Sequence, residues 1–455
     1  MKITDHSQSA PSQLNTSQND SLPSDSTYTR WRFAFALLLV LWITVTSTLR
    51  GALQSKFLFD FEIFYGAAVR LSEGKQLYVP MKFGESVYNQ SPFPAIAFLP
   101  LTHFTVEQAS RMWTVFSVLV IVASIVVFAQ VLKLRWQDTV SGIILIVTTF
   151  YFWPTVIDFS AGQINYILLF LLCVLYWCDT RPVASSAPQE PSQSMSSDRN
   201  AISRKSHSFW ASKSKRDIAI AAVIVLMSMT KTWCIGLILL YILRKRFRVV
   251  GITLGLYLLT MLALFSYIGF HQFNDFMAVT RASSSQTWLV SYSLSGFTRL
   301  YFADNYLNIN PIIDNIWVYR LFLLMGFLLV ARGLWTIFRH GEPHSPLEAR
   351  LQLGFVVSSI LLLTPLCHIA YFQLCLPLLW TFLAASLLEK NAFTPWTLIG
   401  AIAIYISFTR PWPNFQALVD YQTFPRSLLI SIPFFTNFAL WLLTWKSLHR
   451  LRSEN

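Results

Sequence analysis

Residues 112–132 read MWTVFSVLVIVASIVVFAQVL, an apolar run without a charged side chain. A run of about 20 such residues crosses the hydrocarbon core of a bilayer as an α-helix. Further apolar runs follow along the chain. Within lipid, only helices and closed barrels satisfy all backbone hydrogen bonds. The stretch therefore predicts an all-α, polytopic membrane protein.

The composition points the same way. The 455 residues are 54% hydrophobic and only 13% charged, whereas soluble domains carry about 25% charged residues. No water-soluble core can enclose this much apolar surface, so lipid must be the solvent. The five cysteines lie in or beside apolar runs without nearby histidines at metal spacing, which favours packing thiols. They are Cys173, Cys178, Cys234, Cys367 and Cys375.

The polar N-terminus differs from the rest of the chain. Residues 1–30 are rich in Ser, Thr, Asn and Gln and predict a disordered tail. Apolar sequence begins at Phe33, too late for a cleaved signal peptide. We expect ten membrane helices, near 33–49, 112–132, 139–157, 163–178, 249–269, 316–338, 350–366, 368–388, 394–410 and 427–445.

The apolar segment 217–243 is interrupted at Lys231 and has basic loops on both sides, 179–216 and 244–248. Basic loops mark the cytoplasmic side, so a single crossing would place one of them outside. A helical hairpin with arms 217–229 and 232–243, and Lys231 at its tip, keeps both inside. The total becomes about twelve membrane helices, with both termini in the cytoplasm.

This topology divides the chain into two cytoplasmic tails, 1–30 and 447–455, and a transmembrane domain, 31–446, in which 179–216 is a flexible cytoplasmic loop. Most Lys and Arg residues then face the cytoplasm. The net charge of +13 is therefore a topology signal and a contact with anionic lipid, and does not indicate nucleic-acid binding.

Four stretches that face outside are large or polar enough to matter: 50–111, 158–163, 270–315 and 410–426. In the first, Phe61, Phe64, Ala68 and Leu71 recur at helical spacing. That pattern predicts an amphipathic helix lying along the membrane interface in the first outer loop.

Asp60 and Glu62 open this interfacial helix and are the first candidates for chemistry. Partial desolvation among aromatic residues raises a carboxylate pKa toward the range useful for a general base. Asp before a helix is also a common N-cap, and that structural interpretation stays open. Two carboxylates two residues apart are a weak metal signal.

Gln163 and Asn165, at the outer start of the fourth helix, are the next candidates. Buried amides can hold sugar hydroxyls, although capping and interhelical hydrogen bonding explain them equally well. Lys231 is an ammonium between two apolar segments, which marks a functional candidate. At the hairpin tip it suits a lipid phosphate, and the alternative is snorkelling to the interface.

Two further groups belong to the same predicted face. Residues 292–300, which include Ser293 and Arg299, suit a turn that contacts hydroxyl or phosphate groups, although taken alone the pattern favours an ordinary loop. His368 follows Thr364-Pro365 at the outer end of a Pro-broken helix pair and could hydrogen-bond substrate or serve structure. The Lys/Arg topology alone places all these candidates outside.

Several ordered blocks resemble glycosyltransferase family 87, the polyprenol-phosphate-mannose-dependent mannosyltransferases. They are Asp60-Phe61-Glu62-Ile63-Phe64-Tyr65-Gly66-Ala67-Ala68, Tyr88-Asn89-Gln90-Ser91-Pro92-Phe93-Pro94, Gly162-Gln163-Ile164-Asn165, Lys231, Ser293-Leu294-Ser295-Gly296, and Thr364-Pro365 with Tyr371. The chain departs at Ser291 and Tyr292, where the family usually has Asn-Gln, and His368 stands two positions earlier than the family's His.

The resemblance implies a C-type glycosyltransferase fold that uses no metal, cofactor or nucleotide. It implies Asp60 as catalytic base and Lys231 on the phosphate of a polyprenyl-phosphate sugar. Glu62, Tyr65, Gln163, Asn165, Ser293, Arg299 and His368 are the predicted substrate-binding residues. By the same resemblance, a hexose, mannose first, would pass to a glycolipid or glycan on the extracytoplasmic face of a bacterial plasma membrane.

Other interpretations remain. A transporter or flippase of a lipid-linked glycan would carry internal repeats and midplane charges, but we find no repeat, and the polar groups gather at one face. A structural scaffold would not need Asp60, Gln163 and Lys231 on one side. Transfer of sugar to protein stays open, because acceptors are not readable from sequence.

Overall fold

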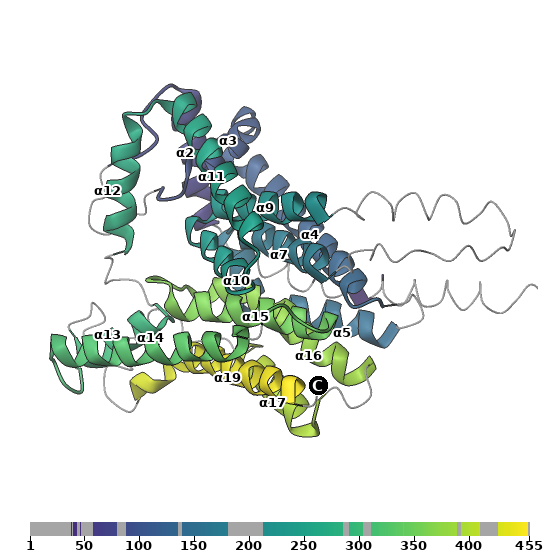
Figure 1. Cartoon of the computed structure of the whole chain (residues 1–455). Helices are drawn as coiled ribbons and strands as arrows, with labels where there is room; N and C mark the ends of the chain where they lie inside the picture. The colour runs from purple at the N-terminus through teal and green to yellow at the C-terminus, as the bar shows by residue number, and fades with distance from the viewer. Residues whose placement is uncertain are drawn as a thin grey trace, which may run out of the picture.

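The computed structural model in Figure 1 describes residues 58–79, 88–134, 139–180, 213–284, 291–303, 311–339, 341–388, 393–409 and 426–453, and a few positions between 38 and 46. All regular elements in these ranges are helical. Most of the predicted helix 33–49, the tail 1–30, nearly all of the loop 179–216 and the stretch 410–425 lie outside the described residues.

The first half of the chain contains α2 (Phe59–Ser72), α3 (Pro92–Phe98), η1 (Leu99–His103), α4 (Val106–Val131), α5 (Thr139–Phe150), α6 (Trp153–Ala161), α7 (Asn165–Thr180), α9 (Lys213–Thr230), η2 (Thr232–Leu237) and α10 (Ile238–Leu243). The second half contains α11 (Phe247–Ile268), α12 (Gln272–Ser284), α13 (Leu294–Phe302), α14 (Ile316–Phe338), α15 (Pro346–Leu363), η3 (Ile369–Cys375), α16 (Leu376–Leu388), α17 (Pro395–Thr409), η5 (Arg426–Leu429) and α19 (Ile432–Ser453).

Five spans among the described residues are long and apolar enough to cross a membrane: α4, α11, α14, α15 and the segment Ile369–Ser386. The bent pair α5 and α6 adds a sixth if it counts as one span. These helices indicate a multi-pass membrane protein. The count of twelve spans and the C-type architecture stay predictions. α2 is a short amphipathic helix at the predicted place, and it buries Phe61, Phe64 and Ala68.

Prolines divide several helices that the hydropathy pattern predicts as continuous. The predicted helix 139–157 is two helices that meet at 52°, and α6 starts at Trp153-Pro154. α15 ends at Leu363 because Thr364 precedes Pro365 and takes an extended conformation. The predicted helix 368–388 begins as the 3-10 helix η3, and Pro377, in the first turn of α16, has no N–H to continue the ladder.

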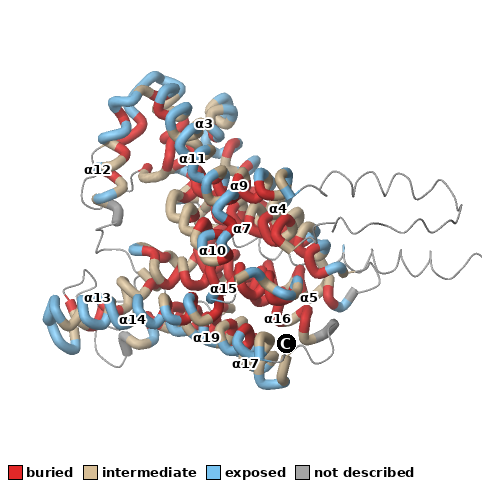
Figure 2. The backbone as a smooth tube through the Cα atoms, in the orientation of Figure 1, coloured by how far each residue is buried: buried red, intermediate tan, exposed pale blue. Residues whose placement is uncertain are grey.

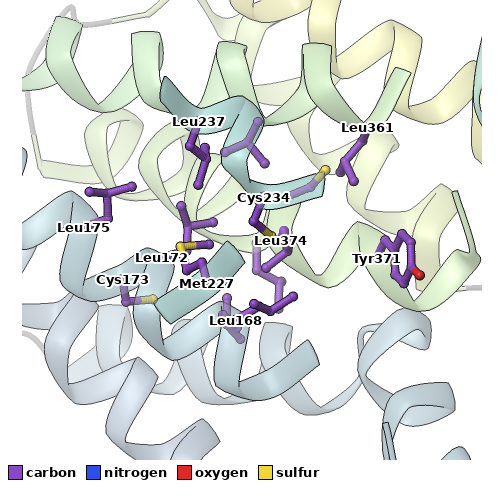
Figure 3. Close-up of a cluster of buried hydrophobic side chains, with 14 of the residues drawn as sticks. Leu168, Leu172, Cys173, Leu175, Met227, Cys234, Leu237, Leu361, Tyr371 and Leu374 are labelled. Carbon is purple, nitrogen blue, oxygen red and sulfur yellow. The ribbon is translucent and has the colours of Figure 1, made fainter. Parts of the chain in front are cut away.

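The helices pack in two groups. In the first, α4 lies on α7, α7 on α9, and α9 on α11. In the second, α15 and α17 pack on α19. Contacts of α7 with η3 and α15 join the groups, and burial is densest there, while α11 and α14 expose long apolar faces (Figure 2). Figure 3 shows this junction, where Leu168 and Leu172 of α7 meet Met227, Cys234 and Leu374.

The segment 213–246 reverses direction at Lys231, as the hairpin prediction required. α9 leads to Lys231, and η2 and α10 lead back, so that Arg246 Nη2 lies 2.5 Å from Asp217 Oδ1. Arg244 joins Asp179 at the end of α7 (2.6 Å) and Gln352 of α15 (2.7 Å). A buried ionic network therefore closes the end of the hairpin opposite Lys231.

Candidate functional site

Asp60 lies in the first turn of α2 and does not cap that helix. The N-cap residue is Leu58, without a side-chain hydrogen bond. The Asp60 carboxylate instead accepts a hydrogen bond from Gln163 Nε2, with 2.5 Å between Nε2 and Oδ2. The interpretation of Asp60 as a helix cap is therefore wrong. Its carboxylate instead forms a polar contact with Gln163.

Gly162 explains why Asp60 meets Gln163. It ends α6 with φ of +67°, in the left-handed region that favours glycine. A Cβ at this position would lie 2.7 Å from the Cβ of Phe61. The absence of that Cβ lets α2 approach the turn closely, and Trp113 Nε1 holds the turn through the Gly162 carbonyl (3.1 Å). Gly-Gln-x-Asn is thus a docking surface for α2.

Asn165 begins α7 and is fully buried. Its Nδ2 donates to Oδ1 of Asp158, 2.6 Å away on α6, and Asp158 is fully buried as well. Asp158 is not among the predicted site residues, because charge bias assigns the stretch 158–163 to an outer loop. An acid within an apolar run is a recognisable signal, the same one that identified Lys231.

Lys231 lies at the tip of the hairpin, with 4% of its surface exposed. Its Nζ is 3.4 Å from the hydroxyl of Tyr371 in η3 and 5.0 Å from the centre of that ring. Figure 3 shows Tyr371 at the edge of the apolar core, with its hydroxyl turned away from it. Near the end of α9, the Met229 carbonyl accepts a hydrogen bond from Ser91, which also caps α3. The Tyr88–Pro94 block therefore contacts the end of α9 two residues before Lys231.

The charges of the site are mutually dependent. Lys231 interacts electrostatically with both Asp60 and Asp158. Burial raises the pKa of Asp60 above its ordinary value, while Lys231 and the hydrogen bond from Gln163 oppose that rise. Burial, assisted by Lys231, lowers the pKa of His368 to about 4. His368 is therefore neutral at pH 7 and can exchange hydrogen bonds without adding charge.

The structure thus joins five of the nine predicted site residues through contacts or electrostatic interactions: Asp60, Gln163, Asn165, Lys231 and His368. His368 belongs through Tyr371, whose ring centre is 5.5 Å from its own, and through its interaction with Lys231. Such a group can accept a proton, hold an anion and bind hydroxyls.

The other four predicted residues have separate positions. Glu62 is exposed, and residues two apart on a helix do not face each other. Tyr65 donates its hydroxyl to the Phe104 carbonyl (2.8 Å) and ties α2 to the start of α4. Ser293 is buried and caps α13. Arg299 lies exposed further along α13.

The described residues contain no cluster of three or more His, Cys, Asp or Glu side chains that could hold a metal ion.

Comparison with known proteins gives one family. The model of glycosyltransferase family 87 matches residues 88–187, a range that contains Asp158, Gly162, Gln163 and Asn165. No curated protein and no solved structure matches the chain. The match covers about a fifth of the chain and supports membership in glycosyltransferase family 87, a family of membrane glycosyltransferases.

Proposed function

We propose that this membrane protein transfers a hexose, mannose first, from a polyprenyl-phosphate sugar to a glycolipid or glycan acceptor. The observation that carries the proposal is the interaction of Asp60 with Lys231. A carboxylate and an ammonium, far apart in sequence, come together beside the amides of one turn. An inverting displacement needs a base on one side of the anomeric carbon and a cation for the leaving anion on the other, and Asp60 and Lys231 are the two groups of the site that can take these roles.

The proposed reaction is a single inverting displacement. Asp60 takes the proton of an acceptor hydroxyl as that oxygen forms a bond to the anomeric carbon of the donor. The bond from this carbon to the phosphate oxygen breaks on the opposite side, and the electron pair leaves with the polyprenyl phosphate. Lys231 stabilises the phosphate charge, and this help acts mainly in the transition state. Gln163 orients the Asp60 carboxylate.

A groove near the site fits the chain of a lipid-linked donor. It has a volume of about 440 Å³, is largely apolar, and runs between α13, α14 and α15. Leu323, Leu324 and Phe327 of α14 line it, with Arg320 on the same wall. It reaches Leu363 and Pro365, close in the chain to His368. We place the isoprenoid chain in this groove, since α14 exposes an apolar face there.

The proposed site faces the extracytoplasmic side of a plasma membrane, because the positive-inside rule assigns the basic loops to the cytoplasm. Lipid-linked sugars on that side need no nucleotide. We propose a glycan of the cell envelope as the final product.

The first test is transfer of radiolabelled mannose from polyprenyl-phosphate-mannose to extracted membrane glycolipids in detergent. Asp60→Asn should lower the rate about 10²- to 10⁴-fold, the range expected for loss of a general base. The matched control is Glu73→Gln, an exposed carboxylate directly after α2 that pairs with Lys75 (2.7 Å). It should transfer at the wild-type rate.

A wild-type rate for Asp60→Asn would remove Asp60 as the base. No product from folded wild type with any lipid-linked hexose would overturn the enzyme assignment in favour of a transporter, which makes no product without a sealed membrane.

A further inference from the structure

The turn between α6 and α7 leaves several buried oxygens without a hydrogen-bond partner. Asp158 uses Oδ1 to accept from Asn165, but its Oδ2 has no partner. Asn165 Oδ1 and Gln163 Oε1 also have none. Buried polar atoms in folded proteins are nearly always satisfied. Three such atoms on one turn therefore make it a candidate surface for a ligand that donates hydrogen bonds.

A fourth oxygen comes from a different element. Gln373 of η3 donates its Nε2 to Thr155 Oγ1 (3.3 Å) and leaves its buried Oε1 without a partner. Thr155 is three residues before Asp158 on α6, so the two side chains lie on the same helix face. Gln373 thus approaches the face of α6 that carries Asp158.

The four oxygens are all acceptors, and two buried donors of α6 and α7, Trp153 Nε1 and the Tyr166 hydroxyl, lack a partner as well. The amide nitrogens of Asn165, Gln163 and Gln373 all donate within the protein, to Asp158, Asp60 and Thr155. What remains is four acceptor oxygens, one of which belongs to a carboxylate. An anion would be repelled by them. A neutral ligand with several hydroxyl groups, such as a hexose, can donate to these oxygens and accept from the two donors, because each hydroxyl both donates and accepts.

We propose that Asp158 is the sugar-recognition residue of the site, with its Oδ2 accepting a hydrogen bond from one hydroxyl of the donor hexose. The assignment rests on the proposed function, which brings a hexose to this turn. Lys231 lies close enough to interact with Asp158 in the ligand-free site.

The test compares wild type with Asp158→Asn on a series of donors that each lack one sugar hydroxyl. The substitution keeps the shape and the bond to Asn165 but places an NH₂ donor where Oδ2 was. We expect KM for the complete donor to rise about 10- to 100-fold, the cost of leaving a buried hydrogen-bonding group unsatisfied. For one deoxy donor the two proteins should have the same KM, because that donor has already lost the bond.

Equal KM differences between the two proteins for every deoxy donor would overturn the proposal, since a merely structural role for Asp158 does not depend on one hydroxyl. Gln373→Met removes another of the four acceptor oxygens and serves as the test should Asp158→Asn fail to fold. It should raise KM for the complete donor with little change in kcat. An unchanged KM in Gln373→Met would also contradict the proposal that these acceptor oxygens bind the sugar.

A binding measurement separates this proposal from the proposed function. Decyl mannoside, an uncharged glycoside, should bind folded wild type and bind Asp158→Asn at least about tenfold more weakly. Binding without transfer activity in wild type would leave the sugar site standing and remove the transferase assignment. Equal binding by both proteins would refute the role of Asp158, whether or not transfer occurs.

Discussion

The pH dependence of transfer tests how Lys231 controls Asp60. A general base works in its ionised form, so activity should be present above the pKa of Asp60 and be lost as the pH falls through it. Lys231 lowers that pKa against the effect of burial. Lys231→Met should therefore move the acid limb of kcat/KM to higher pH and reduce kcat about 10²- to 10³-fold, as for other lost electrostatic contacts.

Lys75→Met is the matched control, because Lys75 is an exposed lysine that pairs with Glu73 (2.7 Å). Its pH profile should coincide with that of wild type. An acid limb in Lys231→Met that stays in place, or moves to lower pH, would contradict the coupling between Lys231 and Asp60.

Gly162 is the residue on which the position of Asp60 depends most. Gly162→Ala adds a Cβ 2.7 Å from Phe61 Cβ at a φ of +67°, so α2 must shift, and the Gln163–Asp60 bond must lengthen. We expect transfer to fall by about 10² or more, the effect of misplacing a catalytic group by about 1 Å. Thermal unfolding and transfer assays measure the two consequences.

The same substitution at Gly66 isolates the steric effect. Gly66 also lies in α2, and a Cβ there meets nothing within 4 Å. Gly66→Ala should keep full activity and stability. A Gly162→Ala protein as active as Gly66→Ala would show that α2 does not depend on the close approach.

Site residues that are unusual within their own stretch of sequence could be predicted. Residues whose role depends on contacts with distant parts of the chain could not. Lys231 was found because an ammonium in an apolar run is costly. Asp158 satisfies the same rule but was assigned to an outer stretch that the structure shows to be part of α6. The contact of Ser91 with Met229 joins residues 138 positions apart and leaves no local signal.

At the scale of elements, the groove between α13, α14 and α15 gives a prediction about the donor chain. Leu323→Trp should fill part of its volume. We expect KM for a polyprenyl-phosphate-mannose donor to rise about tenfold, in line with the 1–3 kcal/mol of overpacking. KM for a short citronellyl analogue should stay unchanged, because that chain does not reach as far.

Leu328→Trp makes the same change on the exposed face of α14, outside the groove, and should leave both KM values at the wild-type level. An equal rise of KM for long and short donors in Leu323→Trp would place the lipid chain elsewhere.

Hydropathy predicted which helices exist, whereas prolines determine where several of them break. The predicted helix 316–338 has the bounds of α14, and α9 with η2 and α10 forms the expected hairpin. The bend before Pro154 and the 3-10 start of the segment that contains Pro377 were not predicted, because apolar composition continues across both. Residues of the proposed site lie near these positions: Asp158 follows Pro154 by one turn, and Tyr371 and Gln373 precede Pro377.

At the scale of the whole molecule, the polar groups collect at two opposite ends. α7 has Asn165 of the site at its start and Asp179 of the ionic network at its end, and α9 runs from Asp217 to the turn at Lys231. Glu348 of α15 extends the network through Gln352 (3.1 Å) and Arg452 (2.5 Å). The described helix ends that flank the basic loops thus meet at one end of the structure.

This two-ended arrangement makes the sidedness of the site measurable. Glu107 begins α4 at the site end and is exposed, whereas Lys213 is exposed at the start of α9, at the network end. α4 rises about 39 Å over its 26 residues, and Arg350 reaches its far end at the Val131 carbonyl (3.4 Å).

An impermeant thiol reagent applied to intact cells should therefore label Glu107→Cys and not Lys213→Cys, and opening the cells should make Lys213→Cys reactive as well. The wild-type chain serves as the background control, since all five of its cysteines are buried and should stay unlabelled. Labelling of Lys213→Cys alone would turn the site toward the cytoplasm. The donor would then have to be presented on the inner leaflet. The site residues and the ionic network lie at opposite ends of α7 and α9, so the site faces the side of the membrane opposite to the network.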